Sequence, residues 1–417
     1  MGSSILFVSL GSWGDVAPVL SIARELRPLG VDARLGVATD YVQGVEDAGF
    51  EAIDLGVDMA SVMVGDIGQA WVGESSRGQQ ATVAATRRLF AEIGPPAISA
   101  MAAAVRSGEM VVSGVMTFPL GAALAEIGSS RHVQLLFLPL SATRSPGATA
   151  FPITPWPSAL NRWSADLAQA SIEKNNRDWT DQIRTTLGLR SWTKANYLAA
   201  LQSTPVLYGV SPQFLPPPPD WPGQVTVSGH LLDEDEQHPP DGLPEFLAEH
   251  PSSIFVGFGS LGGSLTVRDW DVITEAVELA GTPAVIAGHP RPAAIGSHSR
   301  TVFTVGQVSH TWLFRRLVGV VHHAGAGTAQ RATLSGVPSV AVPLVGDQPY
   351  WARRLAALRV APEPVPYSRL NPRRLAGAIK AMVTNPEYSR QAQRISRAMS
   401  DENGPTTAAC FLQQVTQ

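Results

Sequence analysis

Short runs of apolar, often β-branched residues alternate along the chain with longer stretches in which apolar residues recur every three or four positions. The short runs predict strands and the longer stretches predict helices. In the first half, the predicted strands are residues 5–10, 32–38, 110–115, 133–138 and 206–210, and the main predicted helices are residues 20–29 and 164–187. This strand–helix–strand order is typical of a parallel sheet covered by helices.

The second half repeats the same alternation. Its predicted strands are residues 253–258, 284–287, 301–305, 318–321 and 339–342, and its predicted helices are residues 270–279, 312–317, 328–334, 372–383 and 386–399. Each half also opens with a strand that feeds a Gly-Ser loop, in residues 3–14 and again in residues 252–262. The pattern therefore predicts two similar α/β domains, whereas residues 56–96 show no regular period.

A proline-rich segment separates the two halves. Residues 215–223 read Leu-Pro-Pro-Pro-Pro-Asp-Trp-Pro-Gly, and consecutive prolines form a stiff extended spacer. We therefore predict a first domain over residues 1–215, a linker over 216–224 and a second domain over 225–394.

Small residues follow the predicted strand 318–321 in the turn His322–Thr328, which reads His-His-Ala-Gly-Ala-Gly-Thr. A helix is predicted to begin there, and the first amides of a helix have no internal partner and carry partial positive charge, so they suit a phosphate. The next strand ends in a loop with Asp347 beside Gln348. A carboxylate and an amide side by side can hold adjacent hydroxyls, so together the two features predict a nucleotide-sugar site.

The segment from His322 to Gln348 resembles the donor-binding signature of family 1 glycosyltransferases with the GT-B fold, especially bacterial antibiotic (glycopeptide and macrolide) and sterol glycosyltransferases. Ala324 stands where the family usually has glycine. The resemblance implies two Rossmann-like domains whose parallel sheets face across a cleft. It also implies that a last helix, within about 395–417, packs back on the first domain.

The resemblance further implies which residues bind the donor. They are Ser12, Gly259, Ser260, Gln307, Val308, His323, Gly325, Ala326, Gly327, Thr328, Asp347 and Gln348. In this interpretation His323 stabilises the departing diphosphate, and Asp347 and Gln348 bind hydroxyls of the sugar. On residue type alone, a lone histidine is better explained as a satisfied core residue, and the serines can be turn residues.

Asp15 is the predicted catalytic base. It follows the first strand in a Gly-rich loop just before a helix, and transfer to a hydroxyl needs a group that takes its proton. Its position alone favours a helix-capping role, whereas the resemblance favours the base. Desolvation against apolar walls would raise its pKa from about 3.9 and make it a stronger base.

Aromatic residues in the first half suggest an apolar acceptor pocket. The predicted acceptor residues are Trp13, Trp71, Phe118, Phe151 and Trp156. Trp13 stands where the family commonly has arginine, and packing between loops explains it equally well.

Composition excludes several other classes. The net charge is −4 without a basic run, so no nucleic-acid partner is expected. Cys410 is the only cysteine, which rules out a disulfide framework within one chain and fits a cytoplasmic location. We expect no signal peptide and no transmembrane segment. The acidic run 233–235 is interpreted as solvated, and neither a metal nor a cofactor beyond the nucleotide-sugar co-substrate is predicted.

The predicted function is inverting, metal-independent transfer of a sugar from a UDP- or dTDP-sugar to a hydroxyl of a lipophilic natural product, as in antibiotic biosynthesis. Two alternatives stay open at this point. One is a nucleotide-sugar epimerase or hydrolase on the same fold, and the other is a non-catalytic donor-binding subunit. The sequence specifies neither the acceptor, the sugar and nucleotide, nor the oligomeric state.

Overall fold

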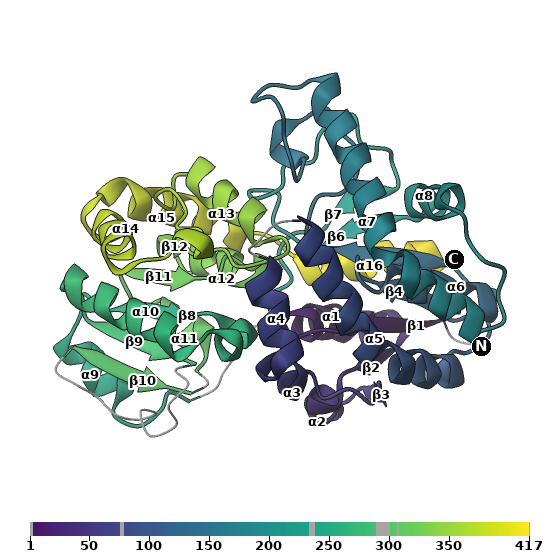
Figure 1. Ribbon diagram of the computed structural model, residues 1–417, viewed down its shortest axis with the longest axis horizontal. Helices are drawn as coiled ribbons and strands as arrows, with labels where there is room; N and C mark the ends of the chain where they lie inside the picture. Colours follow the sequence, from purple (N-terminus) through teal and green to yellow (C-terminus); the bar gives the residue numbers. More distant parts are fainter. Residues whose placement is uncertain (1–2, 76–78, 233–237, 289–300, 307, 417) are drawn as a thin grey trace. The chain divides into compact units, whose positions relative to one another are not determined.

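A computed structural model describes residues 3–75, 79–232, 238–288, 301–306 and 308–416. The chain divides into two compact units (Figure 1). Unit 1 comprises residues 1–62, 80–233 and 402–417, and unit 2 comprises residues 63–79 and 234–401.

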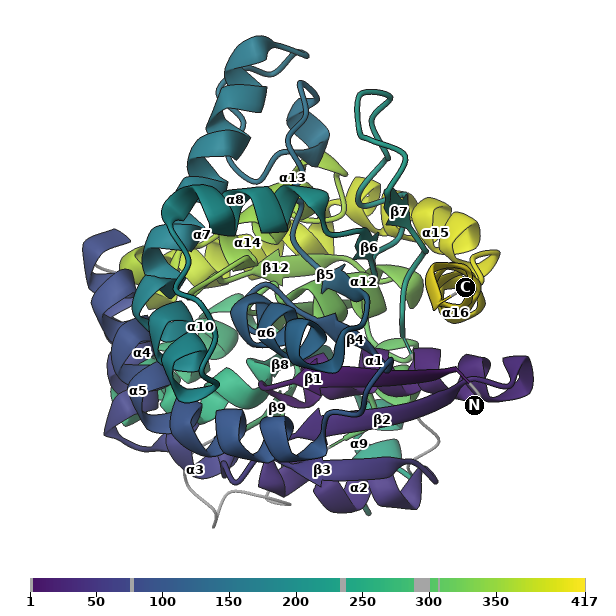
Figure 2. The same cartoon turned by 90° about the vertical axis from the view of Figure 1, so that its right-hand side faces the viewer.

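Unit 1 is built on a parallel sheet of seven strands in the order β3-β2-β1-β4-β5-β6-β7 (Figure 2). The strands are β1 Ser4–Ser9, β2 Asp32–Val37, β3 Glu51–Asp54, β4 Met110–Ser113, β5 His132–Leu136, β6 Val206–Tyr208 and β7 Val225–Val227. The inner strands are buried along almost their whole length, because helices cover both faces of a parallel sheet. This is why they appear in the sequence as nearly continuous apolar runs.

The helices of unit 1 come from both ends of the chain. They are α1 Trp13–Leu26, α2 Val42–Asp47, α5 Gln79–Ala104, α6 Phe118–Gly128, α7 Ala159–Thr186, α8 Lys194–Ser203 and α16 Gly404–Thr416, and α3 Met59–Val64 ends at the start of unit 2. The final helix, α16, packs against α1. Ala408, Ala409 and Leu412 of α16 thereby join the main hydrophobic core of unit 1.

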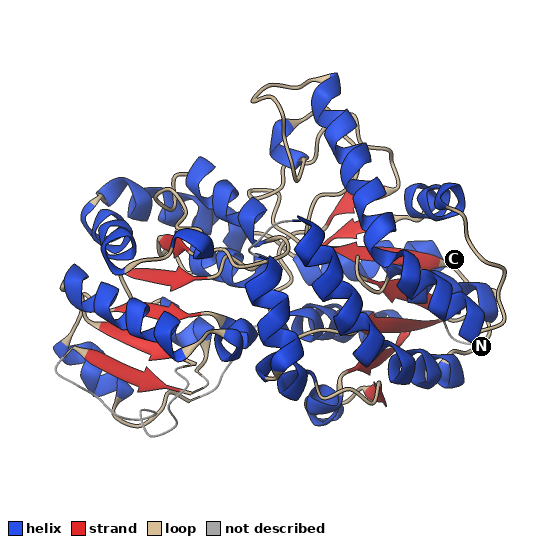
Figure 3. Ribbon diagram, viewed as in Figure 1, coloured by secondary structure: helices blue, strands red, loops and turns tan. Residues whose placement is uncertain are grey.

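Unit 2 has a parallel sheet of five strands in the order β10-β9-β8-β11-β12, and helices pack against it (Figure 3). The strands are β8 Ile254–Gly257, β9 Ala284–Ala287, β10 Val302–Val305, β11 Gly319–His322 and β12 Ser339–Ala341. The helices are α4 Asp66–Ser75, α9 Leu243–Glu249, α10 Val267–Ala280, α11 His310–Phe314, α12 Ala326–Leu334, α13 Gln348–Ala357, α14 Pro372–Thr384 and α15 Pro386–Ser400. Helix α10 packs on α14, and α12 packs on α15.

The proline-rich segment is part of unit 1, so its interpretation as an interdomain linker over 216–224 is wrong. Asp220 accepts hydrogen bonds from Thr143 Oγ1 (2.5 Å) and from the backbone N–H of Arg144 (2.8 Å). The Trp221 ring stacks on Tyr208 with centroids 5.0 Å apart. These contacts fix the segment before β7, and the next passage of the chain from unit 1 to unit 2 lies beyond it, at residues 233–234.

Two other predictions need correction. The C-terminal region forms two helices, of which α15 stays in unit 2 and only α16 lies in unit 1. Residues 56–96 are largely helical, with α3, α4 and the start of α5. Pro95 and Pro96 lie inside α5, and such prolines, together with glycines, obscured the helical period. Helix α4 contacts the 3₁₀ helix Gly259–Ser264 of unit 2.

Candidate functional site

Gly259, His323 and Gly325, three of the predicted donor residues, lie where the order of the strands in the sheet of unit 2 reverses. Strand β8 pairs with β9 on one side and with β11 on the other, which makes the loops after β8 and β11 the walls of a topological switch point, the usual ligand site of such sheets. Gly259 follows β8 and His323 follows β11. A Cβ placed on Gly259 would lie 3.3 Å from Cε1 of His323, and one on Gly325 would lie 2.5 Å from Nε2. The imidazole therefore lies against both glycines.

The start of α12 offers backbone donors beside this imidazole. Gly325 is the N-cap and provides no side-chain cap, and the first intrahelical bond runs from Ala329 N–H to the Gly325 carbonyl (2.9 Å). The amides of Ala326, Gly327 and Thr328 thus stand at the positive end of the helix dipole without intrahelical acceptors. Gly327 is exposed. The arrangement suits an anion such as a diphosphate.

His323 is a neutral donor at physiological pH. Burial, followed by the charge of His310, lowers the pKa of His323 to about 4. Its Nδ1 is buried and has no hydrogen-bond partner among the described residues. An uncharged imidazole can still donate one N–H to a phosphate oxygen, so the positive field at this site comes mainly from the helix end.

His322 has a structural role that the sequence did not indicate. Its ring is fully buried, and its Nδ1 accepts the backbone N–H of Ala324 at 3.0 Å. Ala324 itself adopts φ +64°, the left-handed region that favours glycine. This explains in physical terms why the related signature carries glycine at that position. The bond to His322 holds the turn that directs Gly325 and α12.

The loop after β12 is held by the two residues predicted to bind the sugar. Gln348 Oε1 accepts the backbone N–H groups of Leu344 (2.8 Å) and Val345 (3.0 Å). Its amide oxygen therefore stabilises the loop conformation. Asp347 Oδ2 accepts the indole Nε1–H of Trp351 at 2.9 Å. Trp351 is fully buried and was not predicted, although its spacing of four residues from Asp347 on one helix was available as a signal.

The remaining donor predictions differ in their surroundings. Ser260 is exposed in the 3₁₀ helix after β8. Val308 is half-buried and packs on the hydrophobic core of unit 2. Gln307 lies outside the described residues. Ser12 is the N-cap of α1 in unit 1, where its Oγ accepts the N–H of Gly14 at 3.2 Å.

Asp15 also lies at a switch point, because β1 pairs with β2 on one side and with β4 on the other. It occupies the third position of α1 and forms a capping box with Ser12. Asp15 Oδ2 accepts the Ser12 backbone N–H at 2.9 Å. A Cβ on Gly11 would lie 2.2 Å from this oxygen, so glycine is required there by the carboxylate.

The environment of Asp15 shifts its acidity toward that of a general base. Desolvation raises the pKa of the Asp15 carboxyl above its usual value, and the hydrogen bonds from Ser12 oppose that rise. The residue as a whole is exposed, although its carboxyl lies close to Gly11 and accepts the Ser12 N–H. The capping interactions are thus compatible with the predicted role of Asp15 as a base, which stays a prediction.

Comparison with known proteins bears on both units. Residues 284–415 match the family described as erythromycin biosynthesis protein CIII-like, C-terminal domain. The matched segment covers 132 of the 417 residues. It contains the His322–Thr328 turn, the Asp347 loop and α16, so the resemblance to antibiotic glycosyltransferases inferred from the sequence is confirmed.

Relatives that match most of the chain carry glycosyltransferase names. The O-mycaminosyltylonolide 6-deoxyallosyltransferase of Streptomyces fradiae is 32% identical over 273 residues, covering 63% of this chain and 61% of that protein. Sterol 3-beta-glucosyltransferase UGT80A2 of Arabidopsis thaliana is 29% identical over 422 residues, covering 96% of this chain and 63% of that protein. The chain thus spans less than two thirds of the length of either relative.

The crystal structure of glycosyltransferase VinC in complex with dTDP matches with a TM-score of 0.69 at 20% identity, covering 99% of each chain. This likeness and the two parallel sheets confirm the GT-B fold. At 20% sequence identity this structural similarity supports the fold alone, and not the substrates or the site residues.

The predicted acceptor residues do not form one group. Phe118 is wrong as an acceptor residue, because its ring is completely buried against His132 and Tyr197. Trp71 lies half-buried on α4, which belongs to unit 2 rather than to unit 1. Trp13 packs on Tyr41 at a centroid distance of 5.7 Å, as the alternative interpretation allowed, and is still 45% exposed.

Phe151 and Trp156 are exposed in the loop before α7, so both remain available to a ligand. Their position in that loop does not by itself connect them with Asp15, which lies at the start of α1. Their assignment to the acceptor therefore stays a prediction.

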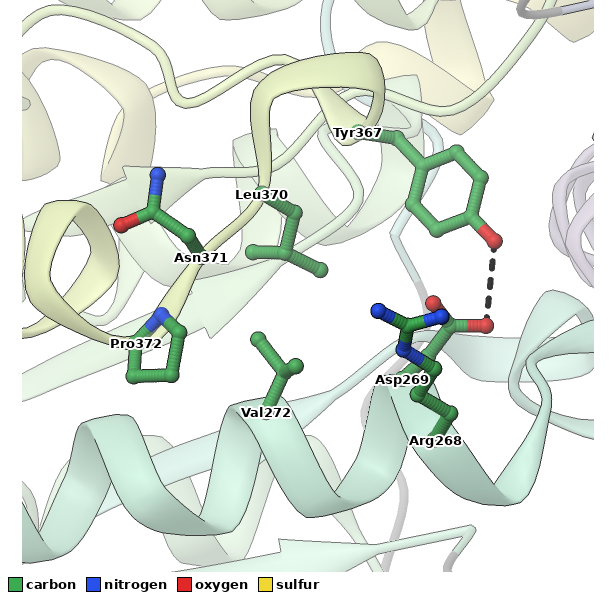
Figure 4. Close-up of a pocket in the computed structure, with 7 residues that line it drawn as sticks. All are labelled: Arg268, Asp269, Val272, Tyr367, Leu370, Asn371 and Pro372. Atoms are coloured by element: carbon green, nitrogen blue, oxygen red, sulfur yellow. Dashed lines mark hydrogen bonds between the residues drawn. The ribbon is translucent and has the colours of Figure 1, made fainter.

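A cavity of about 440 Å³ lies elsewhere in unit 2, between α10 and the segment before α14 (Figure 4). Its lining residues are Arg268, Asp269, Val272, Tyr367, Leu370, Asn371 and Pro372. Tyr367 donates its hydroxyl to Asp269 Oδ2 at 3.0 Å and closes one side. Residues of the predicted donor site do not line this cavity, so it is separate from the His323 site.

Metal-binding clusters and membrane-spanning helices are both absent from the part of the chain that the structure describes. No three or more His, Cys, Asp or Glu side chains are arranged there to hold a metal ion. No helix there has the length and apolar character that crossing a membrane requires. Metal independence remains a prediction.

Proposed function

We propose that this chain is an inverting glycosyltransferase that moves a sugar from a UDP- or dTDP-sugar to a hydroxyl of a lipophilic natural product. The observation that carries the proposal is the convergence of Gly259, His323 and the uncapped start of α12 at the switch point of unit 2. The names of the relatives, a macrolide deoxyallosyltransferase and a sterol glucosyltransferase, support the same reaction and suggest the acceptor class.

In the proposed mechanism, Asp15 takes the proton of the acceptor hydroxyl as the oxygen attacks the anomeric carbon. The new C–O bond forms on the face opposite the diphosphate, and the old bond breaks with its electron pair leaving on the diphosphate oxygen. The α12 amides and His323 stabilise this negative charge, and Asp347 and Gln348 orient the sugar. The proposal involves no metal, and it places the enzyme in the cytoplasm, a reducing compartment that suits a chain with one cysteine.

The test compares Asp15→Asn with Asp15→Ala. A panel of UDP- and dTDP-sugars is crossed with macrolide and sterol acceptors, and transfer is read as a mass shift. Both variants should lose transfer by about 10²–10⁴-fold, the usual contribution of a positioned base. Asparagine keeps an oxygen that accepts the Ser12 N–H, so only the alanine variant should lose about 1 kcal/mol of stability through the cap.

Donor binding provides the control. The dissociation constant for UDP or dTDP, measured by calorimetry, should be the same in wild type and Asp15→Asn, and it should rise in His323→Ala. If Asp15→Asn transferred the sugar at the wild-type rate, Asp15 would not be the catalytic base. If the wild-type chain consumed the donor equally fast with and without an acceptor, the function would be that of a hydrolase or an epimerase rather than a transferase.

A further inference from the structure

The 3₁₀ helix Gly259–Ser264 is held at both of its ends. Its first residue, Gly259, lies against His323 in the predicted diphosphate site. Its last residue, Ser264, is buried, and its Oγ donates to the backbone carbonyl of Met63 at 2.8 Å. Because these 6 residues form one short helix, a displacement of its end also displaces its start.

The acceptor of this hydrogen bond comes from the first half of the sequence. Met63 precedes Ser264 by 201 positions and lies in the segment 63–79 that belongs to unit 2. Helix α4 of that segment contacts the 3₁₀ helix as well. A Cβ placed on Gly263 would lie 3.0 Å from Cγ2 of Val64. The end of α3 and the helix α4 therefore pack directly on the loop after β8.

The turn between α3 and α4 fixes the position of the Met63 carbonyl. A Cβ placed on Gly68 would lie 2.3 Å from this carbonyl oxygen, a distance that only glycine allows between two backbone segments. The side chain of Gln69 donates from Nε2 to the Val64 carbonyl at 2.9 Å and closes the same turn. The turn thus presents the Met63 carbonyl to Ser264.

We propose that residues 63–75 form a positioning segment for the donor, which acts through the Met63 carbonyl and Ser264 to hold the loop after β8 in the conformation that binds the diphosphate. The inference rests on the function proposed above. It makes Ser264 a positioning residue, since its hydroxyl is bonded to the backbone of the segment. Without this bond only a fraction of the molecules would have the loop in its binding conformation, and the apparent affinity for nucleotide would fall by that fraction.

The first experiment compares Ser264→Ala with Ser253→Ala. Ser253 is the matched control, because it is also buried and its Oγ donates to a backbone carbonyl, that of His250, at 2.7 Å. It precedes β8, at the opposite end of that strand from the switch point. Both variants should lose a similar free energy of unfolding in urea, since each loses one buried hydrogen bond.

Their nucleotide affinities should differ. The dissociation constant for UDP or dTDP, measured by titration calorimetry, should rise about five- to tenfold in Ser264→Ala and keep its wild-type value in Ser253→Ala. Wild-type affinity in Ser264→Ala overturns the proposal. An equal loss of affinity in Ser253→Ala also overturns it, because the effect would then follow from lost stability.

The second experiment approaches the same bond from α4. Gly68→Ala displaces the Met63 carbonyl and should weaken nucleotide binding about as much as Ser264→Ala does. The double variant should bind no more weakly than either single variant, because both changes remove one bond. Gly73→Ala is the control on the same helix, since a Cβ there meets nothing within 4 Å, and it should keep wild-type affinity. Multiplied losses in the double variant would refute the proposed connection.

Hydrogen exchange provides a readout that a purely structural defect would not change. By linkage, a bound nucleotide should stabilise the segment that supports its loop. Saturation with UDP or dTDP should therefore slow exchange in peptides from residues 63–75 at least about threefold in wild type and leave it unchanged in Ser264→Ala. Exchange that does not respond to nucleotide in wild type contradicts the proposal.

The outcomes separate this inference from the function on which it rests. A wild-type chain that binds neither UDP nor dTDP would overturn the proposed donor and this inference with it. Nucleotide binding that is equally tight in wild type, Ser264→Ala and Gly68→Ala would overturn the inference alone.

Discussion

Replacing Ala324 with glycine should leave the stability of the protein nearly unchanged, although Ala324 is completely buried. Three effects compete. Relief of the left-handed conformation at φ +64° is worth about 1–2 kcal/mol. Loss of one buried methyl group costs about 0.8 kcal/mol, and the greater freedom of glycine in the unfolded chain costs about 0.4–1 kcal/mol. The sum lies within about 1 kcal/mol of zero.

The matched control is Ala332→Gly. Ala332 is equally buried but lies inside α12, so its substitution relieves no strain. Glycine in a helix interior costs about 0.8–1 kcal/mol, and the lost methyl adds about 0.8 kcal/mol. We therefore expect Ala332→Gly to be destabilised by about 1.5–2 kcal/mol.

Urea unfolding followed by tryptophan fluorescence measures both variants, and comparable slopes allow their midpoints to be compared. A midpoint for Ala324→Gly as low as that of Ala332→Gly would refute the reasoning, because it would mean that the turn after β11 gains nothing from glycine. Ala324→Val serves as a further check. A β-branched residue is a poor fit at positive φ, so this variant should be the least stable of the three.

Three further predictions concern activity and pH. Gly11→Ala places a Cβ 2.2 Å from Asp15 Oδ2 and so displaces the carboxylate; transfer should fall at least about tenfold while UDP or dTDP binding is unchanged, and equal turnover would contradict the assigned position of the base. Trp351→Phe removes the 2.9 Å bond to Asp347 and should weaken binding of the nucleotide sugar roughly tenfold but not of the free nucleotide, as titration calorimetry would show. Burial lowers the pKa of His322 to about 3, below its unfolded value of about 6.5, so stability is full above pH 6.5 and is lost as pH falls toward 3; a thermal midpoint that stays constant from pH 7 to 4 would contradict this.

The inner strands of both sheets were predictable because they are buried on both faces. Runs such as residues 5–10 and 318–321 contain little but apolar residues, and the structure places β1 and β11 there within one or two positions. The edge strands β3 and β7 were missed. Each has only three or four residues, and β7 is only half-buried, so neither produces a long apolar run.

The proximity of Gly259 and His323 in the predicted donor site followed from the sequence, because it depends on topology. The loops after the first and fourth strands of a doubly wound sheet meet at the switch point, and this brings Gly259 to His323 although they are far apart in the chain. Contacts that depend on which way a side chain points did not follow. The aromatic ring of Phe118 is buried in the core, and the His322 side chain accepts a hydrogen bond from the backbone N–H of Ala324. The spacing of residues in the sequence does not predict either side-chain orientation.

The assignment of residues 63–79 to unit 2 has a practical consequence for engineering. Exchanging halves between related enzymes at the proline-rich segment would separate α4 from the loop after β8, where Ser264 Oγ donates to the carbonyl of Met63 at 2.8 Å. A hybrid made in that way would combine the five-stranded sheet of one parent with a foreign α4. Transplanting residues 63–79 together with 234–401 keeps each native pair of surfaces in the same parent.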